Sequence, residues 1–73
     1  MEGIYEFKNG KNTWGILVNK NYTHIIKTSL PRHMQMGKTF QNIQVAQESY
    51  KDASLKAFLF QIECGLAQPV ELV

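Results

Sequence analysis

The sequence predicts a small α+β domain in which an antiparallel β-meander packs against one C-terminal α-helix. An Asn-Gly pair at positions 9 and 10 separates two segments of alternating apolar and polar residues, which is typical of a β-hairpin. A largely apolar segment near the C-terminus lies between a capping residue and a glycine, which indicates a helix. Because 73 residues can build only one core, we expect residues 1–73 to form a single domain.

The first two strands are expected at residues 3–8 and 12–19. With Asn9-Gly10 as the two-residue loop of a type I′ turn, Tyr5 would pair with Trp14. Side chains alternate across a strand, so this pairing collects the large apolar residues on one face. That face would carry Tyr5, Phe7, Trp14, Ile16 and Val18. The opposite face would be largely polar.

Residues 22–29 favour a third strand, because β-branched and aromatic residues dominate the segment and Pro31 follows it. A three-residue loop at residues 19–21 would turn Tyr22 and Ile26 toward the Trp14 face. The outer face would then carry an apolar stripe formed by Ile4, Leu17 and Ile25. Such a stripe would be a candidate contact site for a partner.

The chain between the third strand and the helix is less regular. Residues 31–38 show no consistent period and are expected to form a loop. Residues 39–47 fit two patterns, since apolar residues alternate with glutamines as in a strand, while the spacing that begins at Phe40 also fits a helical face. We favour a fourth strand at residues 39–45 and keep the helix as the alternative.

A helix is predicted at residues 50–64. Ser49 and Asp52 have the spacing of a capping box, and Gly65 stands where a glycine commonly ends a helix. The segment is apolar on most sides, so we expect broad burial against the sheet and against the tail or another subunit. The last residues, 70–73, either add an edge strand or fray.

The cysteine content and the N-terminal sequence bear on the cellular compartment. Cys64 is the only cysteine, which fits a reducing compartment, and we expect it to be a small core residue. The chain does not begin with a basic segment followed by an apolar one, so we expect a cytoplasmic protein. The longest uncharged apolar stretch, residues 57–62, is far shorter than the roughly 20 residues that cross a bilayer, so no membrane partner is expected.

Residues that commonly carry enzyme chemistry are few. His24 and His33 are separated along the chain, and neither has a cysteine or carboxylate at zinc-ligand spacing. Glu48 and Asp52 are explained by the helix dipole and by capping. No glycine-rich phosphate-binding loop occurs in full. We therefore expect a protein that is not an enzyme and that needs no metal or cofactor.

The basic residues are concentrated in the β half of the chain. Residues 1–40 carry six basic and two acidic side chains, whereas residues 41–73 carry two basic and four acidic ones. Such asymmetry favours an anionic partner such as DNA or RNA. The candidate nucleic-acid-binding residues are Lys8, Lys11, Lys20, Lys27, Arg32 and Lys38. Because lysine outnumbers arginine seven to one, we expect contacts to the phosphate backbone rather than to base edges.

Three groups of nucleic-acid-binding domains share residues with this chain. The arm-type DNA-binding domain of tyrosine-recombinase integrases resembles it in the order Gly3-Ile4-Tyr5, Asn9-Gly10-Lys11, Trp14 and Lys27-Thr28-Ser29-Leu30. Plant-type and phage-type three-stranded DNA-binding domains are similar through Lys38-Thr39-Phe40, Ala46, Tyr50 and Ala53, although the arginine-rich first strand of the plant-type domains has no counterpart. A sheet of four strands with one helix also resembles single-strand-binding coactivator domains. These resemblances imply nucleic-acid binding by a phage or mobile-element protein.

The sequence leaves two functions open. The first is a small nucleic-acid-binding or regulatory module that uses a lysine-bearing sheet surface. The second is a protein-interaction module, such as a small inhibitor, an adaptor or a subunit of a homodimer. The candidate partner-binding residues of this second function are Ile4, Leu17, Ile25, Phe58 and Phe60.

Overall fold

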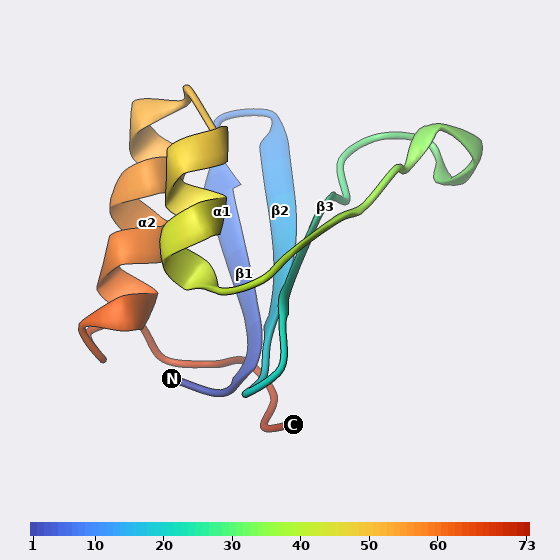
Figure 1. Ribbon diagram of the computed structural model, residues 1–73. Helices are drawn as coiled ribbons and strands as arrows, with labels where there is room; N and C mark the ends of the chain where they lie inside the picture. Colours follow the sequence, from blue (N-terminus) through green and yellow to red (C-terminus); the bar gives the residue numbers. More distant parts are fainter.

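The computed structural model describes residues 1–73 and shows a four-stranded antiparallel sheet with two helices over one face (Figure 1). The strands lie side by side in chain order: β1 (Gly3–Asn9), β2 (Asn12–Val18), β3 (Thr23–Lys27) and β4 (Lys38–Phe40). One 3₁₀ turn, η1, spans Arg32–Met34, and the helices are α1 (Ile43–Ser49) and α2 (Ala53–Glu63). The predicted α+β class and the meander are confirmed, and the second helix is an addition.

The β1–β2 turn lies one residue later than predicted. Gly10 and Lys11 form the loop, so Tyr5 lies opposite Ile16 rather than Trp14. Gly10 has a φ of +62°, and no residue other than glycine has a positive φ. This fits a type II′ turn, in which only the first loop residue needs a positive φ, whereas type I′ needs two. Each residue of β1 thus pairs with the residue of β2 two positions beyond the predicted one. Side chains alternate with a period of two, so the same residues stay on the apolar face.

The β2–β3 turn is also shorter than predicted. Val18 pairs with Thr23, and the Asn19 N–H donates to the Tyr22 carbonyl at 3.1 Å, which leaves a loop of two residues instead of three. The Asn19 side chain closes the turn, because its Oδ1 accepts from the N–H groups of Asn21 and Tyr22 at 2.8 and 2.9 Å. Local bonds of this kind are common where Asn begins a turn.

This shorter turn reverses the predicted orientation of β3. A shift of one residue moves every side chain of a strand to the other face. Ile25 therefore lies opposite Ile16 in the core, while Ile26 lies opposite Gly15 on the outer face. The predicted stripe of Ile4, Leu17 and Ile25 is wrong, because Ile25 is 1% exposed. Tyr22 lies in the turn rather than on the core face.

The ambiguous segment 39–47 contains both of the elements that its pattern allowed. β4 ends at Phe40, and α1 begins at Ile43. Asn42 caps the helix, since its side chain accepts from the Val45 N–H at 2.9 Å. The predicted strand at 39–45 is therefore too long. Ile43 and Ala46 are the buried residues of α1, in agreement with the helical alternative.

Helix α2 begins three residues later than predicted. Asp52 is its N-cap, and the carboxylate accepts from the N–H groups of Ser54 and Leu55 at 2.9 and 3.1 Å. Ser49 instead ends α1, where its hydroxyl donates to the Val45 carbonyl at 3.1 Å. The predicted capping box is therefore wrong, because the two residues belong to different helices.

The C-terminus of α2 ends as the sequence predicts. Gly65 has a φ of +77° and donates to the Ile62 carbonyl at 3.1 Å, while the Leu66 N–H donates to the Gln61 carbonyl at 2.9 Å. Together these bonds form a Schellman motif. Cys64, the residue before the glycine, is exposed, so the prediction that it is a core residue is wrong.

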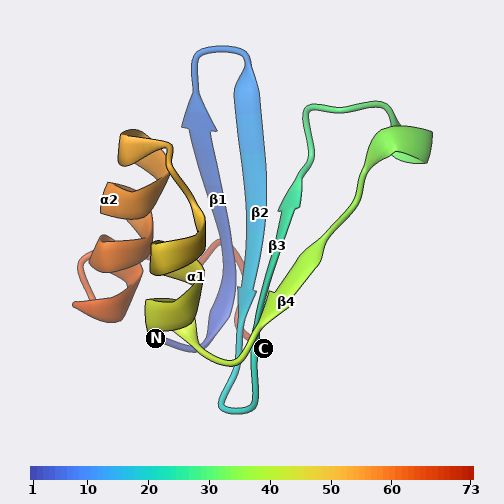
Figure 2. The same cartoon turned by 45° about the horizontal axis from the view of Figure 1, so that its top comes forward.

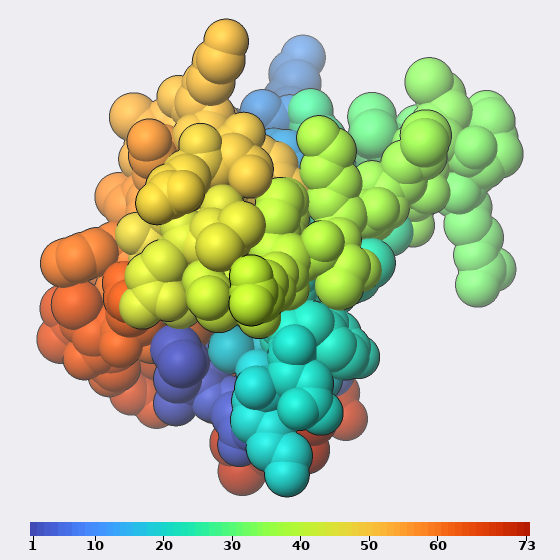
Figure 3. Space-filling view, in the orientation of Figure 1, coloured from blue at the N-terminus to red at the C-terminus, as the bar shows by residue number.

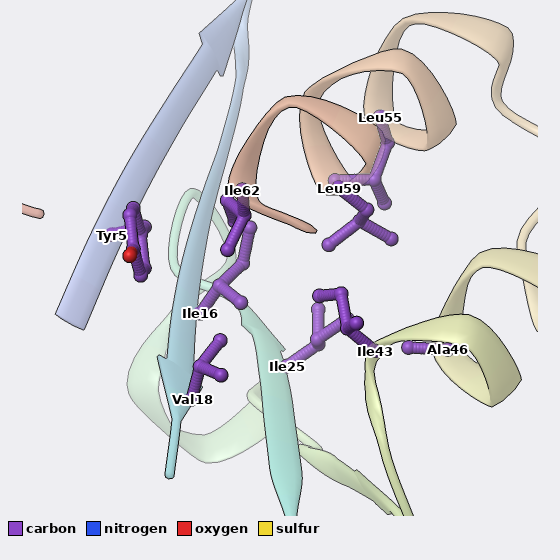
Figure 4. Close-up of a cluster of buried hydrophobic side chains, with 9 residues drawn as sticks. All are labelled: Tyr5, Ile16, Val18, Ile25, Ile43, Ala46, Leu55, Leu59 and Ile62. Atoms are coloured by element: carbon purple, nitrogen blue, oxygen red, sulfur yellow. The ribbon is translucent and has the colours of Figure 1, made fainter. Parts of the chain in front are cut away.

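The core lies between the sheet and the two helices (Figure 4). Tyr5, Ile16 and Ile25 form a row across β1, β2 and β3. The complete cluster is Tyr5, Ile16, Val18, Ile25, Ile43, Ala46, Leu55, Leu59 and Ile62. α2 contributes one face only, whereas Phe60 is 55% exposed, so the predicted broad burial of this helix is wrong.

The C-terminal tail crosses the edge of β1. The Ile4 N–H donates to the Glu71 carbonyl at 2.6 Å, and the Val70 N–H donates to the Ile4 carbonyl at 2.7 Å. Gly3 is needed beside the tail, because a Cβ there would lie 2.6 Å from the Cβ of Pro69. The tail, expected either to add an edge strand or to fray, pairs with the edge of β1 through a single antiparallel bridge. No helix has the length and apolar character needed to span a membrane.

The connection between β3 and β4, residues 28–37, stands away from the sheet (Figure 2). We call this connection the arm. Its base is fixed to β2 because the Thr28 N–H donates to the Thr13 carbonyl at 2.8 Å. Inside the arm, the Gln35 side-chain amide donates to the Leu30 carbonyl at 2.9 Å. The predicted loop is therefore braced internally and contains the η1 turn.

Neighbouring residues of α2 provide a test of this packing. We expect Leu59→Ala to lower the free energy of unfolding by about 2–5 kcal/mol, because Leu59 is fully buried and its truncation leaves a cavity. Phe60→Ala, a larger truncation on the exposed side, should change it by less than about 0.5 kcal/mol in dilute solution. Urea unfolding of both variants makes the comparison. Equal losses would contradict the orientation of α2.

Candidate functional site

Three connections meet at one end of the molecule. The β1–β2 turn, the arm and the α1–α2 junction at residues 50–52 all lie toward this end, whereas the β2–β3 turn and both chain termini lie at the other (Figures 1 and 2). The arm is the most prominent projection in the space-filling view (Figure 3). The meander causes this arrangement, because alternate connections of antiparallel strands fall at opposite ends.

Most of the basic residues belong to the elements of this end, which we call the cationic end. It comprises Lys8, Lys11, Lys27, Arg32, Lys38, Lys51 and Lys56. Three acidic residues accompany them, so the net charge is +4. The other end has a net charge of −2, from Lys20, Glu2, Glu63 and Glu71. The molecule is therefore electrostatically polar, although its total charge is only +2.

Lys8 and Lys11 lie at the tip of the first hairpin. The Lys8 ammonium lies 3.4 Å from a carboxylate oxygen of Glu6, and its side chain is 71% exposed. Exposed ion pairs of this kind are weak and leave the lysine free to exchange partners. Lys11 occupies the second position of the turn and is exposed. Both charges can therefore reach an approaching anion.

Lys27 lies over an aromatic cluster on the inner face. Its ammonium is 5.5 Å from the centre of the Trp14 ring, a distance that fits a cation–π contact. Tyr50 packs edge-on against both Trp14 and Phe40, with 5.7 Å between ring centres in each case. The indole N–H of Trp14 is buried and has no acceptor within the protein. The cluster fixes the α1–α2 junction beside β2.

Arg32 and Lys38 belong to the arm and its exit. Arg32 is exposed in the η1 turn, and Lys38 is exposed on the edge strand β4. The arm also carries two exposed apolar side chains, Met34 and Met36, which are 53% and 85% exposed. This segment therefore combines positive charge with apolar surface.

The structure brings together five of the six candidate nucleic-acid-binding residues. Lys20 is the exception, because the β2–β3 turn lies at the opposite end. Lys51 and Lys56 lie at the cationic end but were not among the candidates. Lys51 lies in the break between the two helices at residues 50–52. The sequence pattern predicts one helix there, so it gives no reason to place Lys51 with the basic residues of this end.

These basic residues surround one end and do not line a face of the sheet. The strand pairing places only Lys8 among the basic residues on the outer face, where it pairs with Glu6 and the remaining side chains are apolar, hydroxyl or imidazole groups. His24 lies there too, with its Nδ1 2.8 Å from the Thr39 hydroxyl oxygen. The sequence predicts a lysine-bearing sheet surface, whereas the structure gathers most lysines at one end of the molecule.

The candidate partner-binding residues are mostly inaccessible. Ile4 and Leu17 face each other on the outer side of the sheet and are partly buried. Ile25 is in the core, and the ring of Phe58 stacks on that of Phe7 with centres 4.8 Å apart. Only Phe60 presents most of its side chain to solvent.

Sites for small ligands are poorly developed. The one groove, about 280 Å³ in volume, lies between the helices and is lined by Gln44, Gln47, Glu48 and Lys56. All four lining residues are polar or charged, whereas pockets for small molecules are lined mainly by hydrophobic and aromatic residues. No group of three or more His, Cys, Asp or Glu side chains is placed to hold a metal ion.

Comparison with models of protein families, with curated proteins and with solved structures found no match to this chain.

The buried Tyr5 and the partly buried Tyr50 predict a loss of stability in alkali. Burial raises the pKa of Tyr5 and of Tyr50 above the usual value of 10.0. The unfolded chain therefore releases these protons at lower pH than the folded one, so the free energy of unfolding falls as the pH rises above about 10. Tyr50→Phe keeps the ring contacts but removes one ionisable group, and should reduce this fall.

Urea unfolding at about pH 8 and about pH 10.5 measures the effect. Tyr22→Phe is the matched control, because that tyrosine lies in the β2–β3 turn outside the core. An identical alkaline loss in wild type and Tyr50→Phe would show that burial of the Tyr50 hydroxyl does not contribute.

Proposed function

We propose that this protein is a cytoplasmic binding module that contacts the phosphate backbone of nucleic acid with its cationic end. The observation that carries the proposal is that seven of the eight basic residues lie at one end, on its three connections or on the strands and helix beside them. Phosphate contacts supply most of the sequence-independent affinity of nucleic-acid-binding proteins. The role is one of binding rather than of catalysis.

Two projections make this end suitable for a strand of phosphates. The tip of the β1–β2 hairpin carries Lys8 and Lys11, and the arm with its exit strand carries Arg32 and Lys38. The hairpin and the arm diverge from a common base on β2 and β3 (Figure 2). A nucleic-acid backbone lying between them would meet cations on both sides, with Lys27 at the base.

The side-chain chemistry favours contacts that tolerate different sequences. Lysine is a flexible point charge that binds phosphate without fixing its orientation, and six of the seven basic residues at this end are lysines. Arg32 alone has the forked geometry that reads guanine or clamps a phosphate with two bonds. We therefore propose binding with dissociation constants of about 10⁻⁴ to 10⁻⁶ M and little preference for sequence.

A protein-interaction module is the second candidate. Its support is the exposed Phe60 on α2, together with Leu66 and Leu72, which are 73% and 78% exposed. These residues lie away from the hairpin tip and the arm. An apolar interface would respond little to salt, whereas phosphate binding weakens steeply as salt rises.

Two lysines in equivalent surroundings provide a matched test. Lys11 and Lys20 are both exposed in two-residue β-turns, but at opposite ends of the sheet. Lys11→Glu and Lys20→Glu each change the net charge from +2 to 0. We expect Lys11→Glu to weaken binding about tenfold and Lys20→Glu to change it less than about twofold, because only Lys11 faces the phosphates.

Fluorescence anisotropy with labelled single- and double-stranded oligonucleotides, at several salt concentrations, gives the affinities. The wild type should lose affinity as salt rises, and Lys11→Glu should have a shallower salt slope by about one unit. If the two variants lose affinity equally, binding depends on total charge and not on this end. Absence of binding to every oligonucleotide at low salt would leave the protein-interaction module as the better candidate.

A further inference from the structure

The outward side of α2 carries an apolar stripe that no other element covers. Ala53, Ala57, Phe60 and Cys64 are all exposed and are spaced by four, three and four residues. With 3.6 residues per turn, this spacing places them on one face of the helix. The opposite face of the helix carries Leu55, Leu59 and Ile62, which are buried in the core. The stripe therefore points directly away from the domain.

We propose that this stripe binds the same stripe of a second copy of the chain, with the two α2 helices antiparallel about a two-fold axis. In such a pair, each residue faces its mirror position about the centre of the contact. With the centre between residues 58 and 59, Ala57 faces Phe60 of the second copy, and Ala53 faces its Cys64. Every large side chain thus meets a small one.

The contact at the centre has the shape that helix pairs need. Phe60 is 55% exposed and is the one large residue of the stripe, and Ala57 offers the small surface on which its ring can lie. Two such contacts form, one on each side of the axis. Buried aromatic anchors of this kind carry most of the energy of small interfaces.

The polar flanks of the stripe have the same symmetry. On the side of α1, the midpoint of Lys56 and Glu63 lies one residue after this centre. Lys56 of each copy therefore lies near Glu63 of the other, so two pairs of unlike charges form across the contact. On the other side, the uncharged Ser54 and Gln61 have their midpoint one residue before this centre, so they also lie near each other across the contact. A parallel two-fold pair would instead place the Lys56 and Glu63 flank of one helix beside the Ser54 and Gln61 flank of the other, so these unlike charges would not meet. The charges therefore select the antiparallel arrangement.

The Glu63 carboxylate is held in place for this role. The side-chain amides of Gln44 and Gln47 both donate to it, the latter at 3.0 Å. An ionised carboxylate has about four acceptor positions, so two remain for a lysine ammonium. α1 thus fixes the acidic half of the pair, while Lys56 remains exposed.

This dimer does not depend on nucleic-acid binding. The cationic end lies at the N-terminus of α2, so the antiparallel pair directs the two cationic ends away from each other. Except for Lys56, which pairs with Glu63 of the second copy, the basic residues of both cationic ends stay open in the dimer. The contact is limited to the 11 residues of each α2 and its C-cap Cys64, so we expect a weak, reversible dimer of the kind formed by small interfaces.

An engineered cysteine tests the geometry directly. In the antiparallel pair, Ala53→Cys places a thiol opposite Cys64 of the second copy, within the range that a disulfide can bridge. Two native Cys64 residues would lie about 16 Å apart along the helices and cannot bridge. Under mild oxidation, Ala53→Cys should yield at least about tenfold more covalent dimer than wild type, joined between positions 53 and 64.

Lys20→Cys is the control, because it adds an exposed thiol at the β2–β3 turn, away from α2. Non-reducing electrophoresis and mass spectrometry of the joined peptides identify the bridge. Equal crosslinking of the two variants overturns the proposal, since collision would then explain the bridge. If the main bridge in Ala53→Cys joined two native Cys64 residues, the proposal would also fail, because these thiols lie too far apart in the antiparallel pair.

Sedimentation velocity of the unmodified protein provides a second, independent measurement. The wild type should sediment as a reversible dimer as its concentration approaches about 1 mM, and Phe60→Asp should remain a monomer. Far-ultraviolet circular dichroism shows whether Phe60→Asp keeps the fold, as the exposure of Phe60 predicts. A wild type that is monomeric at every concentration, or a folded Phe60→Asp that still dimerises, contradicts the proposal.

Discussion

The lengths of the two tight turns determine which side chains enter the core. Each turn has two loop residues, and together they align Tyr5, Ile16 and Ile25 in one row across three strands. Since side chains alternate along a strand, one residue more in either loop would move the following strand's side chains to the other face. The buried surface under the helices, and therefore the position of α1 and α2, follows from this alignment.

The sequence specifies the first hairpin well and the third strand poorly, for a physical reason. β1 and β2 alternate apolar and polar residues, so their core face can be predicted even though the turn is displaced by one residue. In β3, Ile25 and Ile26 are adjacent and chemically identical, so no periodicity tells which one is buried. Only the bonds around Asn19 set the loop length, and these depend on geometry that a pattern does not contain.

The helices show a similar limit. β4 has three residues, and α1, which begins three residues after β4 ends, has seven. Both elements are too short for the strand or the helix periodicity to be recognised in the sequence. Asp52 was recognised as a capping residue, but its assignment to the third position of a helix concealed the break at residues 50–52. That break places Lys51 among the basic residues of the candidate site. The grouping of charges could not be predicted either, because it arises from the meander's alternation of ends.

The pairing of Ile4 with Glu71 joins the two extremities of the chain to the same edge of the sheet. A unit whose ends meet can be inserted into a surface loop of a host protein without stretching either connection. The chain can also be circularly permuted, with a short linker that joins the original termini and new termini placed outside the core strands. The architecture therefore has the modularity of a cassette, in which the hairpin tip and the arm point away from the point of attachment.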